Sequence, residues 1–148
     1  MDFTKNQTAI RTLHYPPAGQ NRVFQSGQLR CGEHADYGSL TLLFQDSPGL
    51  EIMTEAGKWI PVSPVAGTVV INIGDMLQRW SSDRLPSTRH RVTFGGKEEK
   101  SVPRQSLALF MNPDTDTVIR CLDGSDKYQP VTMKEYLAMK HKAAYCSD

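Results

Sequence analysis

Short runs of alternating apolar and polar residues recur along most of the chain, separated by turns rich in glycine and proline. Such alternation is typical of β-strands that bury one face. The stretch 68–73 is rich in β-branched residues, and we expect it to form a central strand. The glycine within 55–57, between two such runs, predicts a hairpin turn. Further strands are predicted at 10–15, on both sides of a turn within 28–44, and at 50–54, 58–62, 89–94, 104–110 and 118–122.

Helical spacing is confined to the end of the chain. Thr132 and Glu135 form a capping-box pattern, and the apolar residues that follow recur at helical intervals, which predicts a helix over 132–145. Before this helix, 89–94 and 104–110 are expected to pair, joined by a long charged connection that bulges outward. Many short strands and one terminal helix indicate a mainly β fold, namely a double-stranded β-helix or jelly-roll barrel with a C-terminal helix.

Size, charge and cysteine content narrow the range of functions. No linker or repeat divides the 148 residues, so we expect one domain over 1–148. The 17 Lys and Arg residues against 16 Asp and Glu leave a net charge of +1, which is not the footprint of a nucleic-acid-binding protein. No apolar run has the length of a signal peptide core or a membrane span. Cys31, Cys121 and Cys146 lack metal-finger spacing and fit a reducing, cytoplasmic location.

A histidine and an aspartate two positions apart lie within the run 28–44. Alternate residues of a strand point to one side, so His34 and Asp36 can reach one point in space. With a second histidine they would form the two-histidine, one-carboxylate triad that holds non-haem Fe(II). His90, 54 residues beyond Asp36, is the natural candidate, because several strands can intervene. Taken alone, such a pair occurs more often in an exposed turn than in a metal site.

Arg104 and Ser106 repeat the two-residue spacing on a later predicted strand. A guanidinium offers a planar, charged fork to two carboxylate oxygens and a hydroxyl adds a donor, so this pair suits one end of a dicarboxylate. Asn72 and Gln78 are polar candidates for the same cavity, although a structural hydrogen bond is the commoner role of such residues. Cys31 stands close to the metal pair, where packing as a small apolar residue explains it better than metal ligation.

Taken together, these motifs resemble the C-terminal half of the iron- and 2-oxoglutarate-dependent oxygenases of the isopenicillin N synthase-like family. The resemblance covers about residues 9–145 and keeps several motifs in family order, which makes it specific. The segments that carry it are 34–44, 49–52, 57–62, 72–80, 87–92, 104–107 and 110–113.

The resemblance implies roles for six side chains in two groups. The implied iron ligands are His34, Asp36 and His90. The implied ligands of the distal carboxylate of 2-oxoglutarate are Arg104 and Ser106, assisted by Tyr15. The implied protein is an Fe(II)- and 2-oxoglutarate-dependent dioxygenase, which uses molecular oxygen to oxidise, and most simply to hydroxylate, a small organic substrate. Succinate and CO2 are the products of the cosubstrate.

Two alternatives stay open. An Fe(II) oxidase of the same fold can carry the same triad and the same arginine-serine pair without using 2-oxoglutarate, because the pair then binds another carboxylate. The second alternative is a truncated, non-catalytic binding domain, since members of the family usually carry an N-terminal helical region that supplies part of the substrate pocket. An intact triad argues against this second alternative.

The N-terminal region of the family has no counterpart in the sequence, which indicates a fragment or a short form. In the family this region covers the outward face of one sheet, and apolar surface left exposed there would cost several kcal/mol, at about 25 cal/mol per Å². The face could be covered by the C-terminal helix, by a second copy of the chain, or by the N-terminal half of a longer protein. We expect the last, with self-association as its substitute in the isolated chain.

Overall fold

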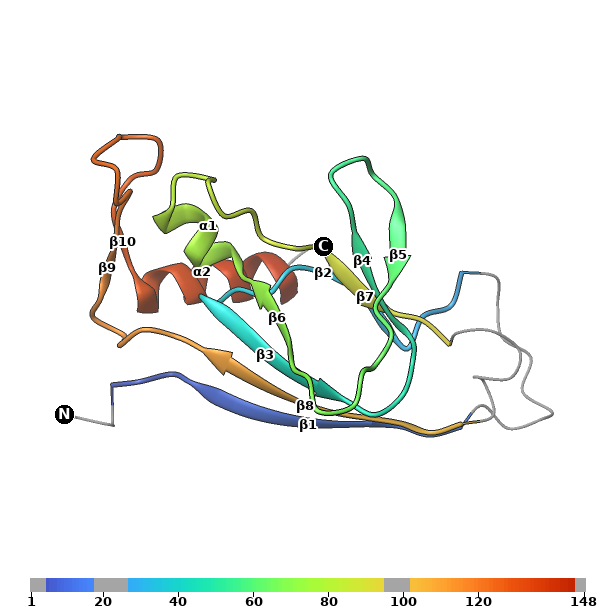
Figure 1. Ribbon diagram of the computed structural model, residues 1–148. Helices are drawn as coiled ribbons and strands as arrows, with labels where there is room; N and C mark the ends of the chain where they lie inside the picture. The colour runs from blue at the N-terminus through green and yellow to red at the C-terminus, as the bar shows by residue number, and fades with distance from the viewer. Residues whose placement is uncertain (1–4, 18–26, 95–101, 146–148) are drawn as a thin grey trace.

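Two antiparallel sheets that face each other form the body of the molecule (Figure 1). The computed structural model describes residues 5–17, 27–94 and 102–145. The larger sheet has the strand order β1-β8-β3-β6, made of β1 (Ala9–Tyr15), β8 (Arg104–Met111), β3 (Leu40–Gln45) and β6 (Val70–Ile73). The smaller sheet has the order β2-β7-β4-β5, made of β2 (Cys31–His34), β7 (His90–Val92), β4 (Leu50–Met53) and β5 (Trp59–Pro61).

The chain passes back and forth between these two sheets. β1, β3, β6 and β8 belong to the larger sheet and β2, β4, β5 and β7 to the smaller, so most successive strands change sheet. Residues far apart in the sequence therefore meet in the space between the sheets. The prediction of a mainly β fold with a C-terminal helix is confirmed. The sheets form an open sandwich and not a closed barrel, because each sheet keeps two edge strands within the described ranges.

The alternation of residues in β8 defines the two faces of the larger sheet. Arg104, Ser106 and Ala108 are buried, whereas Gln105 and Leu107 are exposed. Because successive side chains of a strand point to opposite faces, the buried set points toward the smaller sheet and the exposed set points away from it. A polar pair, Arg104 and Ser106, is thus placed in the interior.

The β-branched run at 68–73 does not form a central strand. β6 pairs with β3 alone, at the edge of the larger sheet, and the side chain of Ile71 is 58% exposed. β-branched residues favour extended backbone, but their propensity does not determine where a strand lies within a sheet. The prediction of a central position was therefore wrong, although the strand itself was predicted correctly.

The expected pairing of 89–94 with 104–110 is also wrong. β7 pairs with β2 and β4 in the smaller sheet, whereas β8 pairs with β1 and β3 in the larger one. Tight hairpins use loops of about two to five residues, and a longer connection leaves the chain free to change sheets. Most of the connection, 95–101, lies outside the described residues, and so does the outward bulge predicted for it.

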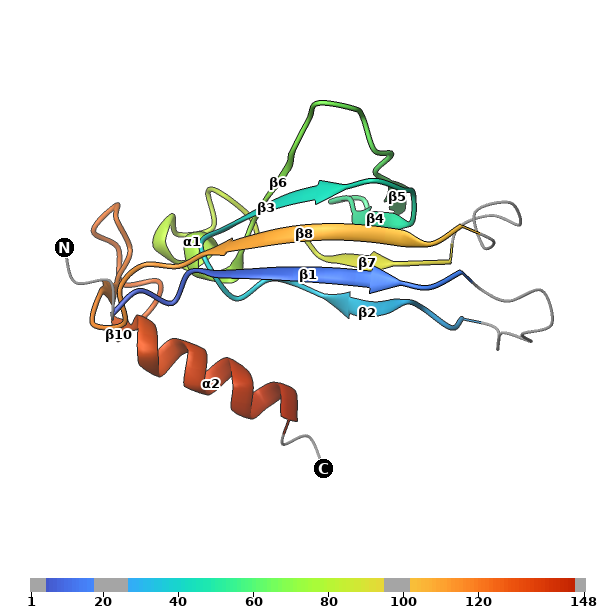
Figure 2. The same ribbon diagram turned by 90° about the horizontal axis from the view of Figure 1, so that it is seen from below.

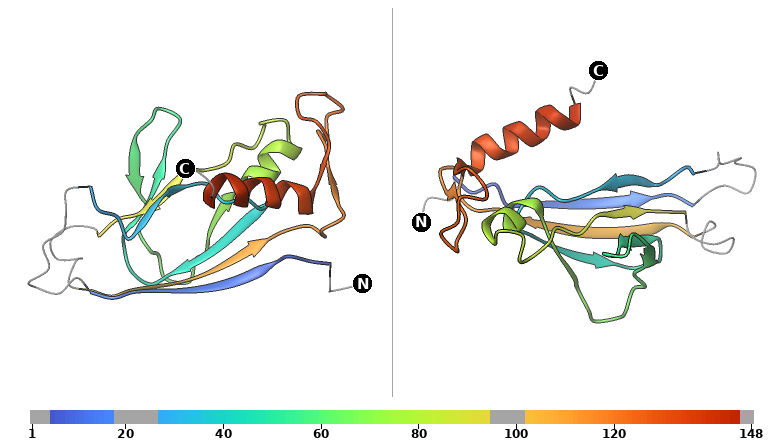
Figure 3. Two further views of the ribbon diagram at one scale, coloured as in Figure 1. Left: turned by 180° about the vertical axis from the view of Figure 1, so that it is seen from behind. Right: turned by 90° about the horizontal axis from the view of Figure 1, so that it is seen from above.

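A hydrophobic core cluster lies at one end of the sandwich (Figure 3). The elements gathered there are α1 (Asp75–Trp80), β9 (Val118–Ile119), β10 (Val131–Thr132) and α2 (Met133–Tyr145). Their buried side chains are Met76, Ile119, Met133 and Tyr136. Helix α1 was not predicted, because six residues are too few to display a helical period. Since only Gly74 separates β6 from Asp75, this core fixes where that strand ends.

The predicted capping box starts the C-terminal helix. The backbone N–H of Thr132 donates to Oε2 of Glu135 at 2.9 Å, and the N–H of Glu135 donates to Oγ1 of Thr132 at 3.3 Å. The helix predicted over 132–145 is observed as α2. It packs beside the sheets and does not cross the outward face of the larger sheet (Figure 2). None of the helices in the described part of the chain is long and apolar enough to span a membrane.

Candidate metal centre

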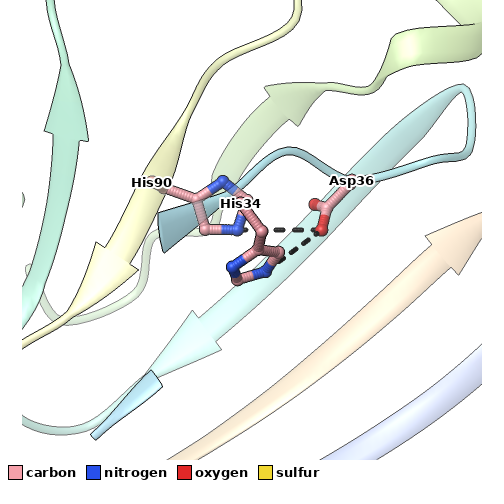
Figure 4. Close-up of side chains that lie close together, drawn as sticks. All are labelled: His34, Asp36 and His90. Carbon is pink, nitrogen blue, oxygen red and sulfur yellow. Dashed lines mark ion pairs between the residues drawn. The ribbon is translucent and has the colours of Figure 1, made fainter. Parts of the chain in front are cut away.

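Three side chains converge between the sheets at the end of the smaller sheet. His34 ends β2, His90 begins β7, and the two lie opposite each other in the strand register. The Nε2 atoms of His34 and His90 lie 3.8 and 3.7 Å from Oδ1 of Asp36 (Figure 4). One ligand atom from each residue lies within 4.8 Å of the other two. The fold therefore brings together the three residues that the sequence singles out as metal ligands.

The hydrogen bonds of the two rings leave their Nε2 atoms free for a cation. Nδ1 of His34 lies 2.8 Å from the carbonyl oxygen of Gly32, and Nδ1 of His90 lies 2.9 Å from that of Thr88. A carbonyl oxygen only accepts, so each Nδ1 carries a proton and each neutral ring keeps its lone pair on Nε2. The separations of 3.8 and 3.7 Å from Oδ1 of Asp36 are within the roughly 4 Å that two ligand atoms about 2 Å from one cation can span. The residues present thus fit a divalent metal.

The carboxylate of Asp36 is fixed by its second oxygen. Oδ2 accepts hydrogen bonds from Oγ1 of Thr41 at 2.6 Å and from Nδ2 of Asn72 at 2.8 Å, while Oδ1 faces the histidines. Asp36 is only 7% exposed, so these donors replace water that the buried carboxylate has lost. Thr41 and Asn72 lie opposite each other on β3 and β6. Asn72, a cavity candidate from the sequence, therefore orients a candidate metal ligand.

The turn that carries Asp36 is docked on the start of α1. The N–H of Asp75 donates to the carbonyl of Asp36 at 2.7 Å, and the N–H of Met76 donates to that of Gly38 at 3.1 Å. A Cβ on Gly74 would lie 2.3 Å from the carbonyl oxygen of Gly38, so only glycine allows this approach. Helix α1 thereby uses its free N-terminal N–H groups to hold the turn that carries Asp36.

Cys31 contacts the first histidine of the site. Its Sγ lies 3.9 Å from Nδ1 of His34, and it lines the cavity as a partly buried residue. This contact raises the pKa of His34 to about 9 and holds the pKa of the Cys31 thiol below its usual range. Cys31 is not one of the three residues that form the candidate metal cluster of the described chain.

A buried arginine lies elsewhere between the same two sheets. Arg104 is 1% exposed; it donates to Oγ of Ser106 at 3.1 Å and to Oε1 of Gln45 at 3.0 Å. Its Nε has no hydrogen-bond partner, and no ion pair joins it to an acidic side chain of the described residues. Burial lowers the pKa of Arg104, because desolvation disfavours the charged form. A buried guanidinium that forms no ion pair is suited to a carboxylate ligand.

The three candidate metal ligands and Arg104 line one cavity of about 110 Å³. Its walls include Tyr15, whose ring lies 5.6 Å from the guanidinium carbon of Arg104 and whose pKa is raised by burial. All six site residues predicted from the sequence line this cavity. Gln78 does not, because its side chain binds Asp83 and the backbone N–H of Ser87. The cavity walls are otherwise largely apolar, with Leu13, Leu43, Leu50, Val70 and Ala108 among them.

Sequence reasoning missed two residues that support the site. Thr41 holds the carboxylate of Asp36, and Gln45 accepts a hydrogen bond from Arg104. Both occupy β3 at positions that alternate with Leu42 and Phe44, so they share one face of that strand. The sequence did contain a signal for both. Polar residues on the buried face of a strand need hydrogen-bond partners, so such positions are candidates for supporting a site.

A family model described as the 2OG-Fe(II) oxygenase superfamily matches residues 6–113. The chain belongs to this superfamily. The resemblance inferred from the sequence motifs is thereby confirmed. Fe(II) and 2-oxoglutarate, the predicted metal and cosubstrate, are the two groups for which the 2OG-Fe(II) oxygenases are named, and the triad of this chain offers the ligands for the metal.

Relatives and solved structures agree on this membership. The chain is 44% identical over 126 residues to the 2-oxoglutarate-dependent dioxygenase htyE of Aspergillus rugulosus, covering 79% of the chain and 38% of htyE. It is 38% identical over 125 residues to the proline hydroxylase buaE of Petromyces alliaceus, covering 80% of the chain and 39% of buaE. The crystal structure of a full-length Neurospora crassa protein in complex with alpha-KG and thymine aligns with a TM-score of 0.83 and 41% identity, covering 92% of the chain and 44% of that protein. The chain spans about two fifths of the length of these relatives.

Proposed function

We propose that the chain is the catalytic domain of an Fe(II)- and 2-oxoglutarate-dependent dioxygenase. It oxidises, and most simply hydroxylates, a small organic substrate, with release of succinate and CO2 from the cosubstrate. The observation that carries this proposal is a single cavity lined by two groups of binding residues. One group is a cluster of two histidines and a carboxylate with free ligand atoms. The other contains a buried arginine that forms no ion pair with the described residues.

Each group of residues has its own binding role in this proposal. His34, Asp36 and His90 hold the metal through three protein atoms and leave further coordination positions open, as oxygen chemistry requires. Arg104 and Ser106 bind the distal carboxylate of 2-oxoglutarate, beside the ring of Tyr15. The names of the relatives, dioxygenase and proline hydroxylase, support a small-molecule oxidation.

The chain contributes positioning and electrostatics to the reaction. When bound, Fe(II) and 2-oxoglutarate supply the oxidation of a substrate C–H bond by molecular oxygen. Asp36, held by Thr41 and Asn72, provides the single anionic ligand and keeps one oxygen aimed at the metal position. Arg104 neutralises the far end of the cosubstrate, so that its other end is held in one orientation. The apolar walls limit access of water to the reacting atoms.

We also propose that the two sheets are the two halves of a double-stranded β-helix. The support for this fold is the passage of successive strands between the sheets and the antiparallel order of each sheet. In such an arrangement the triad lies at one mouth of the sandwich, on β2, β7 and the turn before β3.

Succinate formation tests the proposed reaction. The chain is incubated with Fe(II), 2-oxoglutarate and oxygen, and succinate is measured against a blank that lacks protein. We expect succinate above the blank for the wild type and for Glu55→Ala, which removes an exposed carboxylate from the turn between β4 and β5. Asp36→Ala is expected to reduce succinate to the blank, because it removes the only anionic ligand. Equal succinate from Asp36→Ala and the wild type would contradict the proposed metal ligand. No succinate from the wild type would contradict the proposed reaction and favour the oxidase or the binding domain.

A further inference from the structure

A second guanidinium lies at the wall of the same cavity. Arg11, Leu13 and Tyr15 alternate along β1 and all line the cavity, whereas Ile10 and Thr12 do not. The guanidinium carbon of Arg11 lies 5.5 Å from the centre of the Phe110 ring, which also lines the cavity. Arg11 is exposed and β1 is an edge strand, so its charge lies at the mouth of the cavity.

Arg11 has no anionic partner in the described parts of the chain. Neither an ion pair nor a hydrogen bond links its side chain to an acceptor there, and it contacts the ring of Phe110 instead. By contrast, Arg91 on β7 pairs with Glu51 at 2.7 Å. A cation held over an aromatic ring at a cavity mouth has its hydrogen-bond donors available to a ligand.

When the metal and 2-oxoglutarate are both bound, the other charges of the cavity cancel and the charge of Arg11 has no counterpart. Asp36 is the one carboxylate among the described residues that line the cavity. With both groups bound as proposed above, Asp36 and the dianionic cosubstrate supply three negative charges, and the divalent metal and Arg104 supply three positive charges. The positive charge of Arg11 therefore remains, and one further anion would neutralise it.

Arg11 is also well separated from the residues proposed to bind 2-oxoglutarate. Tyr15 lies opposite Arg104 in the strand register, and Arg11 precedes Tyr15 by four residues, roughly 13 Å along an extended strand. Arg11 lies opposite Ala108, in the same row as Leu43 and Val70. The next row contains Phe110 and Thr41, and Thr41 binds the metal ligand Asp36. An anion on Arg11 would thus lie beside an apolar wall that leads to the metal.

We propose that Arg11 binds a carboxylate of the prime substrate, which makes the substrate a small monocarboxylate with an apolar body. This inference rests on the proposed function and specifies the substrate class of the same site. A guanidinium binds a carboxylate through two parallel N–H donors, and the apolar wall accommodates the rest of the molecule. Arg11 is a substrate-binding residue in this assignment, distinct from the arginine that binds the cosubstrate.

The test compares a carboxylate with its uncharged counterpart. Benzoate and benzamide are titrated by anaerobic calorimetry into the Fe(II) protein saturated with 2-oxoglutarate, so that Arg104 is already occupied. The variants are Arg11→Gln and Arg11→Lys, with Arg120→Gln as a control that removes an exposed arginine outside the cavity lining. Far-UV circular dichroism checks that each variant is folded, and the visible band of the bound cosubstrate checks that 2-oxoglutarate is in place.

Benzoate is expected to bind the wild type and Arg120→Gln at least about tenfold more tightly than benzamide, since a charged hydrogen bond contributes about 1.5–3 kcal/mol. Arg11→Gln is expected to lose this preference, and Arg11→Lys to retain part of it. Equal binding of both probes to the wild type, no binding of benzoate, or unchanged benzoate binding in Arg11→Gln would overturn the inference. Loss of 2-oxoglutarate binding in Arg11→Gln would overturn it too, by assigning Arg11 to the cosubstrate. Absence of the cosubstrate band from the wild type would instead contradict the proposed function.

Discussion

Asp36 shows how the proposed metal ligands are oriented by hydrogen bonds with residues outside the three-residue cluster. One oxygen faces the two histidines, and the other receives two hydrogen bonds from β3 and β6. The histidines are held in the same way, by backbone carbonyls that fix which nitrogen carries the proton. Each ligand therefore enters the site already oriented, so little conformational entropy is lost when a cation binds.

Thr41→Val tests this orientation at one residue. The substitution keeps the size of the side chain and removes the 2.6 Å hydrogen bond to Asp36, so the carboxylate is less well held. We expect the affinity for Fe(II) to fall about tenfold or more, the usual effect of losing such a partner. Anaerobic calorimetry measures it, with Thr68→Val as the control, since Thr68 is exposed and lies outside the cavity lining. Equal Fe(II) affinity in wild type and Thr41→Val would show that Asn72 alone fixes the carboxylate.

At the scale of elements, the short helix α1 positions the turn that carries Asp36. Its first N–H groups bind the carbonyls of Asp36 and Gly38, and Gly74 allows the two segments to approach within contact. The same helix contributes Met76 to the small core with α2 and β9. The position of Asp36 therefore depends on packing that lies outside the cavity.

Gly74→Ala is expected to disturb the site through this contact. Its Cβ would lie 2.3 Å from the carbonyl oxygen of Gly38, which is backbone and cannot rotate away. We expect destabilisation of about 1–3 kcal/mol, the range typical of overpacking, together with weaker Fe(II) binding. Chemical denaturation and metal titration measure the two effects. Gly32→Ala is the matched control, because a Cβ there meets nothing within 4 Å; similar losses in both variants would contradict the docking argument.

At this scale, the sequence could predict features that depend on residues close together in the chain. It could not predict features that depend on contacts between distant segments. The two-residue spacings of His34 with Asp36, and of Arg104 with Ser106, are local, and they identified side chains that do line one cavity. The capping box of α2 is local as well. The edge position of β6 is set by which strands pair across the chain, and no property of its own residues reports that. Helix α1 is stabilised by its tertiary contacts, so its short sequence carried no periodic signal.

For the whole molecule, the main unusual feature is the outward face of the larger sheet, which exposes apolar side chains to water. Its exposed apolar side chains include Ile10, Phe44, Ile71, Leu107 and Met111. Ile10 and Ile71 lie in one row of the sheet, and Phe44 and Leu107 lie opposite each other in the next. Helix α2 does not cross this face (Figure 2), which removes one of the three covers considered from the sequence. Contiguous apolar patches of this kind mark interaction surfaces.

We expect the isolated chain to self-associate through this face, with a second copy as the cover. Sedimentation velocity over a concentration series should show the weight-average mass rising with concentration. Phe44→Gln and Ile71→Thr together should return the chain to a monomer, because they place polar groups in the centre of the patch. Leu122→Gln is the control, since Leu122 is 73% exposed and lies elsewhere, after β9. A compact wild-type monomer that binds no apolar dye would contradict this prediction.

Anaerobic binding of 2-oxoglutarate is the most direct test of the central claim that one cavity holds both Fe(II) and 2-oxoglutarate. The cosubstrate is added to the Fe(II) protein without oxygen, and the visible charge-transfer band of the metal-bound cosubstrate is followed. The account predicts a saturable band of one cosubstrate per chain, no band in His90→Ala, and binding weakened about tenfold or more in Arg104→Ala and less in the milder Ser106→Ala. No band in the wild type, or a band of equal strength and affinity in Arg104→Ala, would contradict it.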